Sequence, residues 1–390
     1  MSKAISFLSG KGGSGKTTLA LSIADLLSRC KIKTLLVDCD LSTNGATYFY
    51  ESRLNSQYRK NKDCISSSFS GIINSDYPVT NFNPVVVNAF LDFFPSISSI
   101  SSNDNTIVNS TYLNSVNDII GEFCRSVKSD YDVVLFDCQA GYTNLLPSLL
   151  HYMDVDLFVL EADSISASAL RNLHLKIGNH FDDAKVYQVF NKATSEEYKI
   201  YSKITGTFFT NIGTLCFDWK IRQAFSRSEI PDLEKISHDY GHDLCEMCRI
   251  MFSEATIQKR LIAFSDYLLY LDKVEEYKVT EKKLEEELGK HKLFSGNSSM
   301  IVELLFPLLM LAYFVYNLIE RKGQSDPGSD ILLLCVAMST SVLSLLSRFL
   351  RDSTSNRGLR KSYESNLREL SAEIRKLERK IDITDVSTIH

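Results

Sequence analysis

Two lysines, a serine, two threonines and four glycines near the start of the chain have the types and the spacing that bind phosphate groups. Glycines let successive backbone N–H groups turn inward around an anion, because no Cβ atom stands in the way. A lysine after the last glycine can reach the β- and γ-phosphates of a nucleotide, and the hydroxyl beside it can ligate Mg²⁺. The pattern Gly-x4-Gly-Lys-Thr therefore predicts a phosphate-binding loop that begins at Gly10 and Lys11 and holds the nucleotide with Gly12, Gly13, Ser14, Gly15, Lys16, Thr17 and Thr18.

The residues on either side supply the strand and the helix that such a loop requires. Residues 4–8 are an apolar run typical of a buried strand, and residues 19–27 have the apolar spacing of a helix. The amino end of that helix adds its partial positive charge to the loop. Strand, glycine loop and helix in this order are the context in which the motif is specific.

Two further apolar segments end in carboxylates. One predicted strand ends in Asp38 and Asp40, and a second, residues 131–137, ends in Asp137. The carboxyl ends of parallel strands meet at one edge of a doubly wound sheet, where ligands bind. We therefore expect Asp137 to hold Mg²⁺, directly or through water, together with Thr17 and Asp40. The alternative for Asp38 and Asp40 is that they cap the loop after the strand.

The second lysine of the loop, Lys11, carries a resemblance to a known family. The run Lys-Gly-Gly-x-Gly-Lys-Thr resembles the deviant Walker A motif of the ParA/MinD ATPases. The resemblance implies that Lys11 reaches across an ATP-sandwich homodimer to the phosphates of the partner subunit, and that it neutralises charge there together with Lys16. It also implies that Asp40 orients the attacking water, and that segments 41–50 and 138–145 respond to the nucleotide.

The chain departs from the family pattern at several positions. Leu41 and Ser42 replace the Pro or Gly that often follows the second aspartate, and Gln139 replaces a proline of the second switch segment. Cys216 replaces a proline near the base. The late Ile-Arg-x-Ala helix start still matches, so the resemblance covers residues 1–265 in the family's motif order.

The base that the resemblance implies is adenine. A predicted strand, residues 185–192, ends in Asn191, where related ATPases place an asparagine that hydrogen-bonds adenine. Thr194 stands where the guanine-reading motif Asn-Lys-x-Asp has its carboxylate. Without that carboxylate nothing there accepts the N1–H and N2–H hydrogens of guanine, and polar sites discriminate strongly against the wrong pattern of donors. ATP is therefore favoured over GTP.

The alternation of apolar strands and helices predicts an α/β fold, a doubly wound and mostly parallel sheet. Residues 112–127 have the spacing of a helix. Residues 51–85 and 97–110 are rich in Ser and Asn and are predicted as loop-rich insertions, which either bind a partner or form plain surface loops. A strand is expected between them, ending at Pro95.

The composition argues against one class of function. The chain has 390 residues and a net charge of −5, so a protein that coats nucleic acid or partitions DNA is not favoured. Nine scattered cysteines indicate a reducing compartment. Cys245 and Cys248 could form half of a zinc site shared by two subunits. The alternative is a pair of thiols in a helical core.

The last third of the chain has the pattern of a membrane anchor. Residues 300–319 and 331–347 are apolar runs of membrane-spanning length around a Gly/Pro turn. The charged segment 273–292 precedes them and a heptad seam over 359–381 follows them, which predicts an antiparallel stalk or an oligomerisation helix. No signal peptide precedes the first strand, and arginines follow the second span. The nucleotide-binding part and the C-terminus are therefore expected on the cytoplasmic side of the inner membrane. A buried helical hairpin is the alternative.

These features predict four parts: an ATPase domain 1–265, a charged stalk helix 266–297, a two-span transmembrane hairpin 298–349 and a cytoplasmic coiled-coil helix 350–390. The expected protein is a membrane-anchored switch ATPase. It would form a homodimer around ATP, hydrolyse the ATP slowly with Mg²⁺, and signal to a protein partner at the membrane. One alternative is a membrane scaffold that holds nucleotide with little hydrolysis. Another is a P-loop tyrosine-kinase-like protein of the polysaccharide-export type, in which the spans normally come first.

Overall fold

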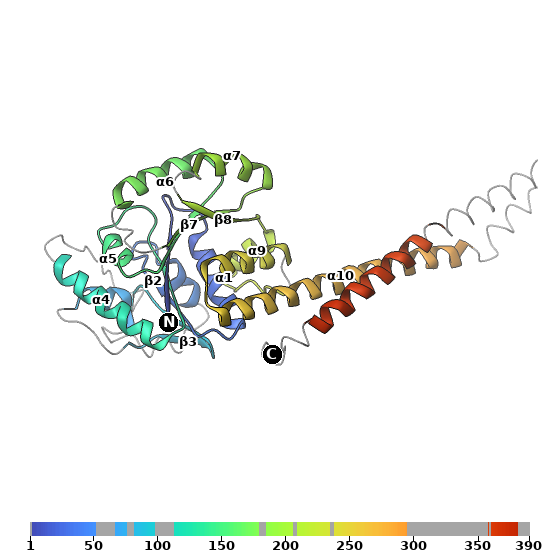
Figure 1. Cartoon of the computed structure of the whole chain (residues 1–390), viewed down its shortest axis with the longest axis horizontal. Helices are drawn as coiled ribbons and strands as arrows, with labels where there is room; N and C mark the ends of the chain where they lie inside the picture. The colour runs from blue at the N-terminus through green and yellow to red at the C-terminus, as the bar shows by residue number, and fades with distance from the viewer. Residues whose placement is uncertain are drawn as a thin grey trace, which may run out of the picture. The chain divides into compact units, whose positions relative to one another are not determined.

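The computed structural model divides into two compact units, each of which is described by itself. The first comprises Met1–Leu269 and Lys380–His390, and the second comprises Tyr270–Arg379 (Figure 1). The structure describes residues 2–51, 67–75, 82–97, 113–178, 185–205, 209–234, 238–294, 358 and 360–380.

The first unit is built on an eight-stranded sheet of described residues. The strand order is β3-β4-β2-β5-β1-β6-β7-β8, and every neighbouring pair is parallel except β3 with β4. The predicted doubly wound, mostly parallel sheet is therefore confirmed. The order reverses beside β1, so the carboxyl end of β1 opens onto the crevice where such sheets bind ligands. The strands are β1 (Lys3–Leu8), β2 (Thr34–Asp38), β3 (Val85–Asn88), β4 (Leu91–Phe94), β5 (Val133–Asp137), β6 (Val155–Leu160), β7 (Lys185–Asn191) and β8 (Thr210–Leu215).

Helices cover both faces of this sheet, and each face has its own apolar core. Along β1 the side chains alternate, so that Ile5 and Phe7 enter one core while Ala4 and Leu8 enter the other. The first core contains residues of α1, α9 and the first turns of α10, and the second contains residues of α3, α4, α5 and α6. The helices are α1 (Lys16–Arg29), α3 (Phe69–Ile73), α4 (Leu113–Asp130), α5 (Leu146–Leu150), α6 (Ser164–Ile177), α7 (Ser195–Thr205), α8 (Trp219–Ser226), α9 (His238–Met251) and α10 (Ala255–Phe294).

The first Ser/Asn-rich insertion contains more structure than its composition predicts. The short helix α3 lies inside residues 51–85, with Ser68 as its N-cap. Its buried residue Phe69 packs against Phe123 of α4, with ring centroids 6.1 Å apart. A five-residue helix is too short for a periodic pattern, so apolar spacing cannot reveal it. The strand expected before Pro95 is present as β4, and β3 adds an antiparallel strand at the edge.

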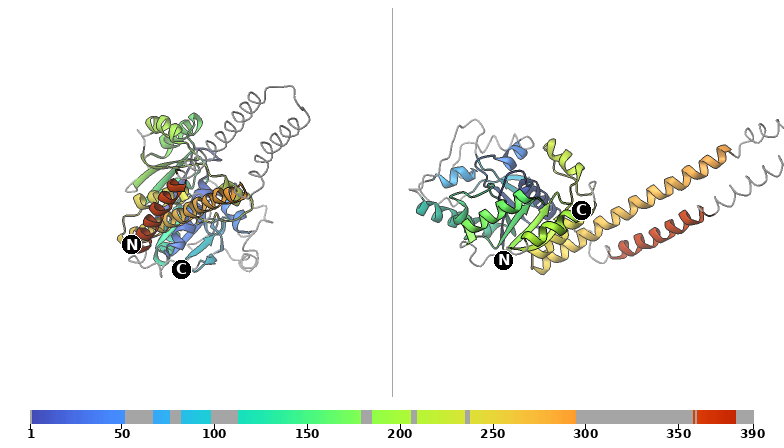
Figure 2. Two further views of the ribbon diagram at one scale, coloured as in Figure 1. Left: turned by 90° about the vertical axis from the view of Figure 1, so that its right-hand side faces the viewer. Right: turned by 90° about the horizontal axis from the view of Figure 1, so that it is seen from above.

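In the second unit, the part of α10 that follows Leu269 and a helix over residues 360–379 lie side by side (Figure 2). Lys273 Nζ lies 3.4 Å from Glu373 Oε2. Within the first unit, Lys380 Nζ lies 2.6 Å from Asp266 Oδ1. A later position on α10 thus pairs with an earlier position on the other helix. The two helices therefore run antiparallel, as the sequence predicts. The less exposed residues of the second helix include the predicted seam positions Tyr363, Leu367, Leu370, Ile374 and Leu377.

The predicted membrane spans lie outside the described residues. Among the helices that the structure describes, none combines the length and the apolar character needed to cross a membrane. The segments in question, 300–319 and 331–347, belong to the part of the chain that is not described.

Candidate nucleotide-binding site

The glycine loop joins β1 to α1 and is shaped by two residues in the left-handed region. Gly13 has φ 86° and Gly15 has φ 84°, which side chains with a Cβ atom rarely adopt. A Cβ atom on Gly15 would collide with Asn191 Nδ2, so only glycine fits there. Asn191 Nδ2 donates a hydrogen bond to the backbone oxygen of Ser14, at 2.9 Å. The phosphate loop and the end of β7 are therefore in direct contact.

Lys16 and Asp137 form a buried ion pair beneath the loop. Lys16 Nζ lies 2.6 Å from Asp137 Oδ1, and the two side chains are 6% and 0% exposed. Burial alone would lower the pKa of Lys16, but the charge of Asp137 and its hydrogen bond raise the pKa above its ordinary value. Lys16 is therefore a cation at neutral pH.

One carboxylate oxygen in this pair has no partner. Asp137 Oδ2 is buried and accepts no hydrogen bond from any residue that the structure describes. A buried, unpaired carboxylate oxygen is costly unless a donor or a cation satisfies it. The hydroxyl of Thr17, on the first turn of α1, is the type of oxygen that Mg²⁺ accepts beside phosphates. The residues present therefore fit Mg²⁺.

Asp40 folds its own loop. Its Oδ1 atom accepts hydrogen bonds from the backbone N of Ser42 and of Thr43 and from the Ser42 hydroxyl, while Oδ2 accepts one from the Thr43 hydroxyl. Burial would raise the pKa of Asp40, but the hydrogen bonds from Thr43 and Ser42 lower it below its ordinary value. A carboxylate has about four lone-pair sites, two on each oxygen, and Oδ2 uses one of its two. Oδ2 therefore retains capacity for one more hydrogen bond, such as one from water.

Asp38 lies in the interior, next to Asp137 in the parallel register of β2 and β5. It is 0% exposed and accepts hydrogen bonds from the backbone N of Asp40 and from the backbone N and hydroxyl of Thr47. Burial, and then the neighbouring charge of Asp137, raise the pKa of Asp38 to about 7. Asp38 thus organises the loop after β2 and lies beneath the site.

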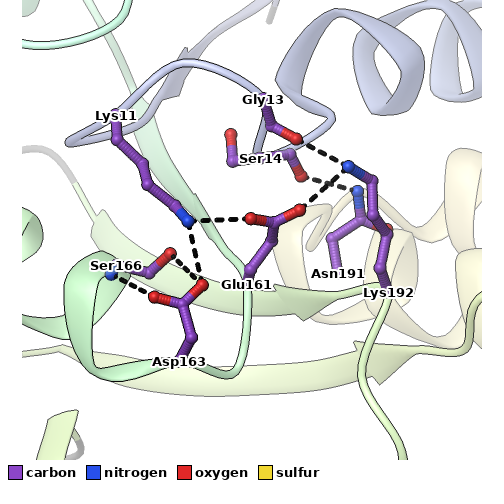
Figure 3. A network of polar contacts seen from close by, with 8 residues as sticks. All are labelled: Lys11, Gly13, Ser14, Glu161, Asp163, Ser166, Asn191 and Lys192. Atoms are coloured by element: carbon purple, nitrogen blue, oxygen red, sulfur yellow. Dashed lines mark hydrogen bonds and ion pairs between the residues drawn. The ribbon is translucent and has the colours of Figure 1, made fainter.

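Lys11 is held by two carboxylates of its own chain, as Figure 3 shows. Its Nζ atom lies 2.9 Å from Asp163 Oδ2 and 2.9 Å from Glu161 Oε2. Hydrogen bonds to Asp163 and then to Glu161 raise the pKa of Lys11 above its ordinary value. Lys192 Nζ binds the other oxygen of Glu161 at 3.0 Å and the backbone oxygen of Gly13 at 2.6 Å.

The structure thus brings the predicted site residues to one edge of the sheet. The loop, Asp40, Asp137 and Asn191 all lie at the carboxyl ends of β1, β2, β5 and β7. Sequence reasoning missed Glu161, Asp163 and Lys192. A signal for all three existed, because Glu161 and Asp163 follow β6 and Lys192 follows β7, so that they reach the same edge.

Cys245 and Cys248 lie in α9 and are both 0% exposed, within the core that α1 and α10 share. Burial raises the pKa of both thiols well above their ordinary value. In the part of the chain that the structure describes, no group of three or more His, Cys, Asp or Glu side chains is placed to hold a metal ion.

Comparisons with known proteins agree with this fold. Residues 2–188 match a family model described as an AAA domain. No curated protein matches the chain. A protein from Borrelia burgdorferi B31 described as a plasmid partition protein, solved with AMPPNP bound, is 19% identical, with a TM-score of 0.51, over 64% of this chain and 98% of that one. Apo McdA from Cyanthece is 16% identical, with a TM-score of 0.51, over 65% and 100%.

The MinC:MinD cell division complex from Aquifex aeolicus is a further structural neighbour, 18% identical with a TM-score of 0.49 over 65% of this chain and 97% of that one. The family match and the fold agree with the resemblance that the loop carries in the sequence. Residues 2–188 therefore resemble an AAA domain, and the chain shares its fold with the Borrelia burgdorferi protein and with McdA.

Proposed function

We propose that this chain is a membrane-anchored ATPase switch. It binds ATP with Mg²⁺, pairs with a second copy around the nucleotide, hydrolyses the ATP slowly and signals to a protein partner at the cytoplasmic face of a membrane. The observation that supports this most is the presence of two lysines with different environments at one phosphate loop. Lys16 is buried on Asp137, whereas Lys11 is partly exposed and held only by acidic side chains at the edge. Once these two ion pairs break, the partly exposed Lys11 can reach a second set of phosphates.

Each side chain at the loop has a separate role in this proposal. Lys16 exchanges Asp137 Oδ1 for the β- and γ-phosphates and balances the charge that develops on them. Thr17 and the unpaired Oδ2 of Asp137 hold Mg²⁺, which supplies charge neutralisation at the phosphates when bound. Asp40 is ionised and orients the attacking water through Oδ2.

The nucleotide proposed is ATP. Asn191 lies against the phosphate loop through Ser14, so a base extending from the loop toward β7 would meet its amide. The Borrelia burgdorferi protein with this fold was solved with AMPPNP, an ATP analogue, which supports the choice.

The membrane part of the proposal rests on the sequence. The two apolar runs 300–319 and 331–347 have the length of membrane spans, and they lie outside the described residues. A chain anchored in this way does not cycle between membrane and cytosol. Its output would be a change of surface in segments 41–50 and 138–145 that a neighbouring protein reads.

A second candidate function is a nucleotide-bound membrane scaffold with little hydrolysis. The observation that favours it concerns Asp40, whose carboxylate accepts four hydrogen bonds within its own loop. These hydrogen bonds leave one lone pair, on Oδ2, that can bind water. The two candidates differ in the chemical step and not in nucleotide binding.

The decisive experiment uses the full chain in detergent or nanodiscs. ATP and ADP binding are measured by calorimetry, dimerisation by sedimentation, and hydrolysis in a single turnover. We expect ATP but not ADP to give a dimer, Lys11→Ala to bind ATP without dimerising, and Asp40→Ala to dimerise without hydrolysing. Lys33→Ala is the matched control, because Lys33 is an exposed lysine over the Tyr131 ring at the opposite end of β2.

The outcomes separate the possibilities. An ATP-dependent dimer in the Lys11→Ala variant would overturn the sandwich. ATP binding with no phosphate release from the wild-type chain would favour the scaffold. Recovery of the chain in the soluble fraction of lysed cells, rather than with the membrane, would overturn the anchor.

A further inference from the structure

The loop that carries Asp40 is fastened by a residue that lies far from it in the sequence. Ser96 follows Pro95 at the end of β4 and is 0% exposed. Its backbone N donates to Thr47 Oγ1 at 2.9 Å, and its hydroxyl donates to Asn44 Oδ1 at 2.7 Å. Its backbone oxygen accepts a hydrogen bond from Ser70 N at 2.8 Å. All three polar groups of Ser96 are thus used to join other elements.

Thr47 connects Ser96 to the end of β2. The Thr47 hydroxyl donates to Asp38 Oδ2 at 2.8 Å, and the backbone N of Thr47 donates to the same oxygen at 2.8 Å. Thr47, Asp38 and Ser96 are each 0% exposed. A buried polar cluster costs desolvation, and it is favourable only if its members satisfy one another. Here they do, and the buried cluster of Thr47, Asp38 and Ser96 fixes the position of the end of the loop.

Asn44 connects this buried cluster to the turn that carries Asp40. Asn44 has φ 50°, a left-handed conformation that non-glycine residues adopt mainly when they are Asn or Asp. Its backbone N donates to the backbone oxygen of Asp40 at 3.0 Å, which closes the turn. The Ser96 hydroxyl holds the side chain of Asn44, and therefore holds the turn that presents the Asp40 carboxylate.

The same loop lies on the phosphate-binding residues. A Cβ atom on Gly45 would lie 3.5 Å from Thr17 Cγ2, which is ordinary van der Waals contact. The position of residues 40–47 would therefore determine how far Asp40 lies from a nucleotide bound in the loop. A small displacement matters, because a shift of about 1 Å in a reacting group can cost about a hundredfold in rate.

Ser96 also contacts the helix in the first insertion. Two amides at the start of α3 donate to this strand end: Phe69 N to Pro95 O and Ser70 N to Ser96 O, each at 2.8 Å. The first amides of a helix have no partner within the helix, so these bonds decide where α3 begins. Ser96 thus joins the loop after β2 to the start of α3.

We propose that Ser96 is a positioning residue for ATP hydrolysis, which holds the loop 40–47, through Thr47 and Asn44, in the conformation that aims Asp40 at the attacking water. The proposal rests on the hydrolytic function proposed above. It also makes α3 the element through which a change in the insertion reaches the catalytic loop.

The test measures kcat, KM and thermal stability of the full chain. Ser96→Ala is expected to lower kcat about tenfold, while KM for ATP stays within about twofold, because the phosphate loop itself is unchanged. Thr47→Val should have the same effect. Thr47→Ser keeps the hydroxyl and should restore kcat to within about twofold of the wild type.

The matched control is Ser6→Ala. Ser6 is also 0% exposed, and its hydroxyl donates to the buried carboxylate of Asp156 in the middle of the sheet. Ser6→Ala should lower the melting temperature to a similar degree but leave kcat unchanged. If Ser96→Ala proves too unstable to purify, the Thr47→Val and Thr47→Ser pair carries the test.

Three results would overturn the proposal: an unchanged kcat in Ser96→Ala and Thr47→Val, a loss of kcat that merely follows a loss of ATP affinity, or an equal loss of kcat in Ser6→Ala. Failure of the proposed function is a different result. In that case the wild-type chain itself would not hydrolyse ATP, or Asp40→Ala would hydrolyse it normally.

Discussion

Lys11 Nζ lies 2.9 Å from Glu161 Oε2 of the same chain. The lysine that we propose to reach the phosphates of a partner subunit is therefore held within its own subunit in this structure. Dimerisation must break this ion pair and the one to Asp163 before the sandwich can form. In the proposed dimer, the strength of these pairs would set part of the threshold for switching.

The first prediction concerns Glu161→Gln. The side chains of Lys11 and Glu161 are 27% and 28% exposed, so the pair contributes up to about 1 kcal/mol after screening by solvent. Removing the charge should lower the protein concentration for half-maximal ATP-dependent dimerisation by about two- to fivefold. Sedimentation at several concentrations measures this. Glu122→Gln, which removes the exposed pair with Arg125 on α4, should change nothing. Weaker dimerisation in Glu161→Gln would contradict the prediction.

The second prediction concerns the buried pair of Lys16 and Asp137. Lys16→Ala should abolish ATP binding in calorimetry. It should also lower the free energy of unfolding by about 3 kcal/mol, because an uncompensated carboxylate stays buried. The double variant Lys16→Ala with Asp137→Ala should recover part of that stability without recovering ATP binding. Denaturant unfolding of the two variants decides this, and equal stability in both would count against the pair.

The third prediction concerns pH and Asp156. Burial raises the pKa of this carboxyl to about 7, although the hydrogen bond from Ser6 opposes the shift. The folded chain therefore holds a proton that the unfolded chain has already released at pH 5, so stability falls as pH rises toward 7. Asp156→Asn should lose about 2 kcal/mol less than the wild type between pH 5 and pH 7. Urea unfolding at both pH values measures the difference. Parallel pH curves would refute the assignment.

The fourth prediction concerns the register of the two C-terminal helices. From the Lys273 and Glu373 pair, moving four residues along α10 reaches Tyr277, and moving three residues back along the other helix reaches Leu370. Tyr277→Cys with Leu370→Cys should form a disulfide within one chain under mild oxidation, identified by mass spectrometry. Tyr277→Cys with Leu377→Cys is one heptad out of register and should not cross-link. Equal cross-linking of both pairs would mean that the register is not fixed.

The site divides into a part that the sequence predicts and a part that it does not. The loop from Gly10 to Thr18, together with Asp137 at a strand end, is encoded in local spacing, and local spacing is visible in one sequence. The hydrogen bonds of Ser96 join residues about fifty positions apart, and no local pattern marks them. The capping of Asp40 by Ser42 and Thr43 was open as an alternative, and only the geometry shows how many of its lone pairs are used.

The same limit applies to the fold. The strands β1, β2, β4, β5, β6 and β7 follow apolar runs, so their order along the chain and the parallel sheet were predictable, whereas the antiparallel edge strand β3 was not predicted. The helix α3 was not, because its stability comes from Phe69 against Phe123 and from amides donated to the end of β4, contacts that form only in the folded chain.

The hydrogen bond from Asn191 to Ser14 has a consequence for base selection. The bond to Ser14 uses one of the two N–H donors of Nδ2, so the carbonyl Oδ1, which can only accept, and one N–H remain for a base. Adenine offers an amino group at position 6, whereas guanine offers a carbonyl oxygen there, and two acceptors repel. The hydrogen bond to the phosphate loop fixes which way the amide of Asn191 is turned, and an Oδ1 turned toward the base would favour adenine.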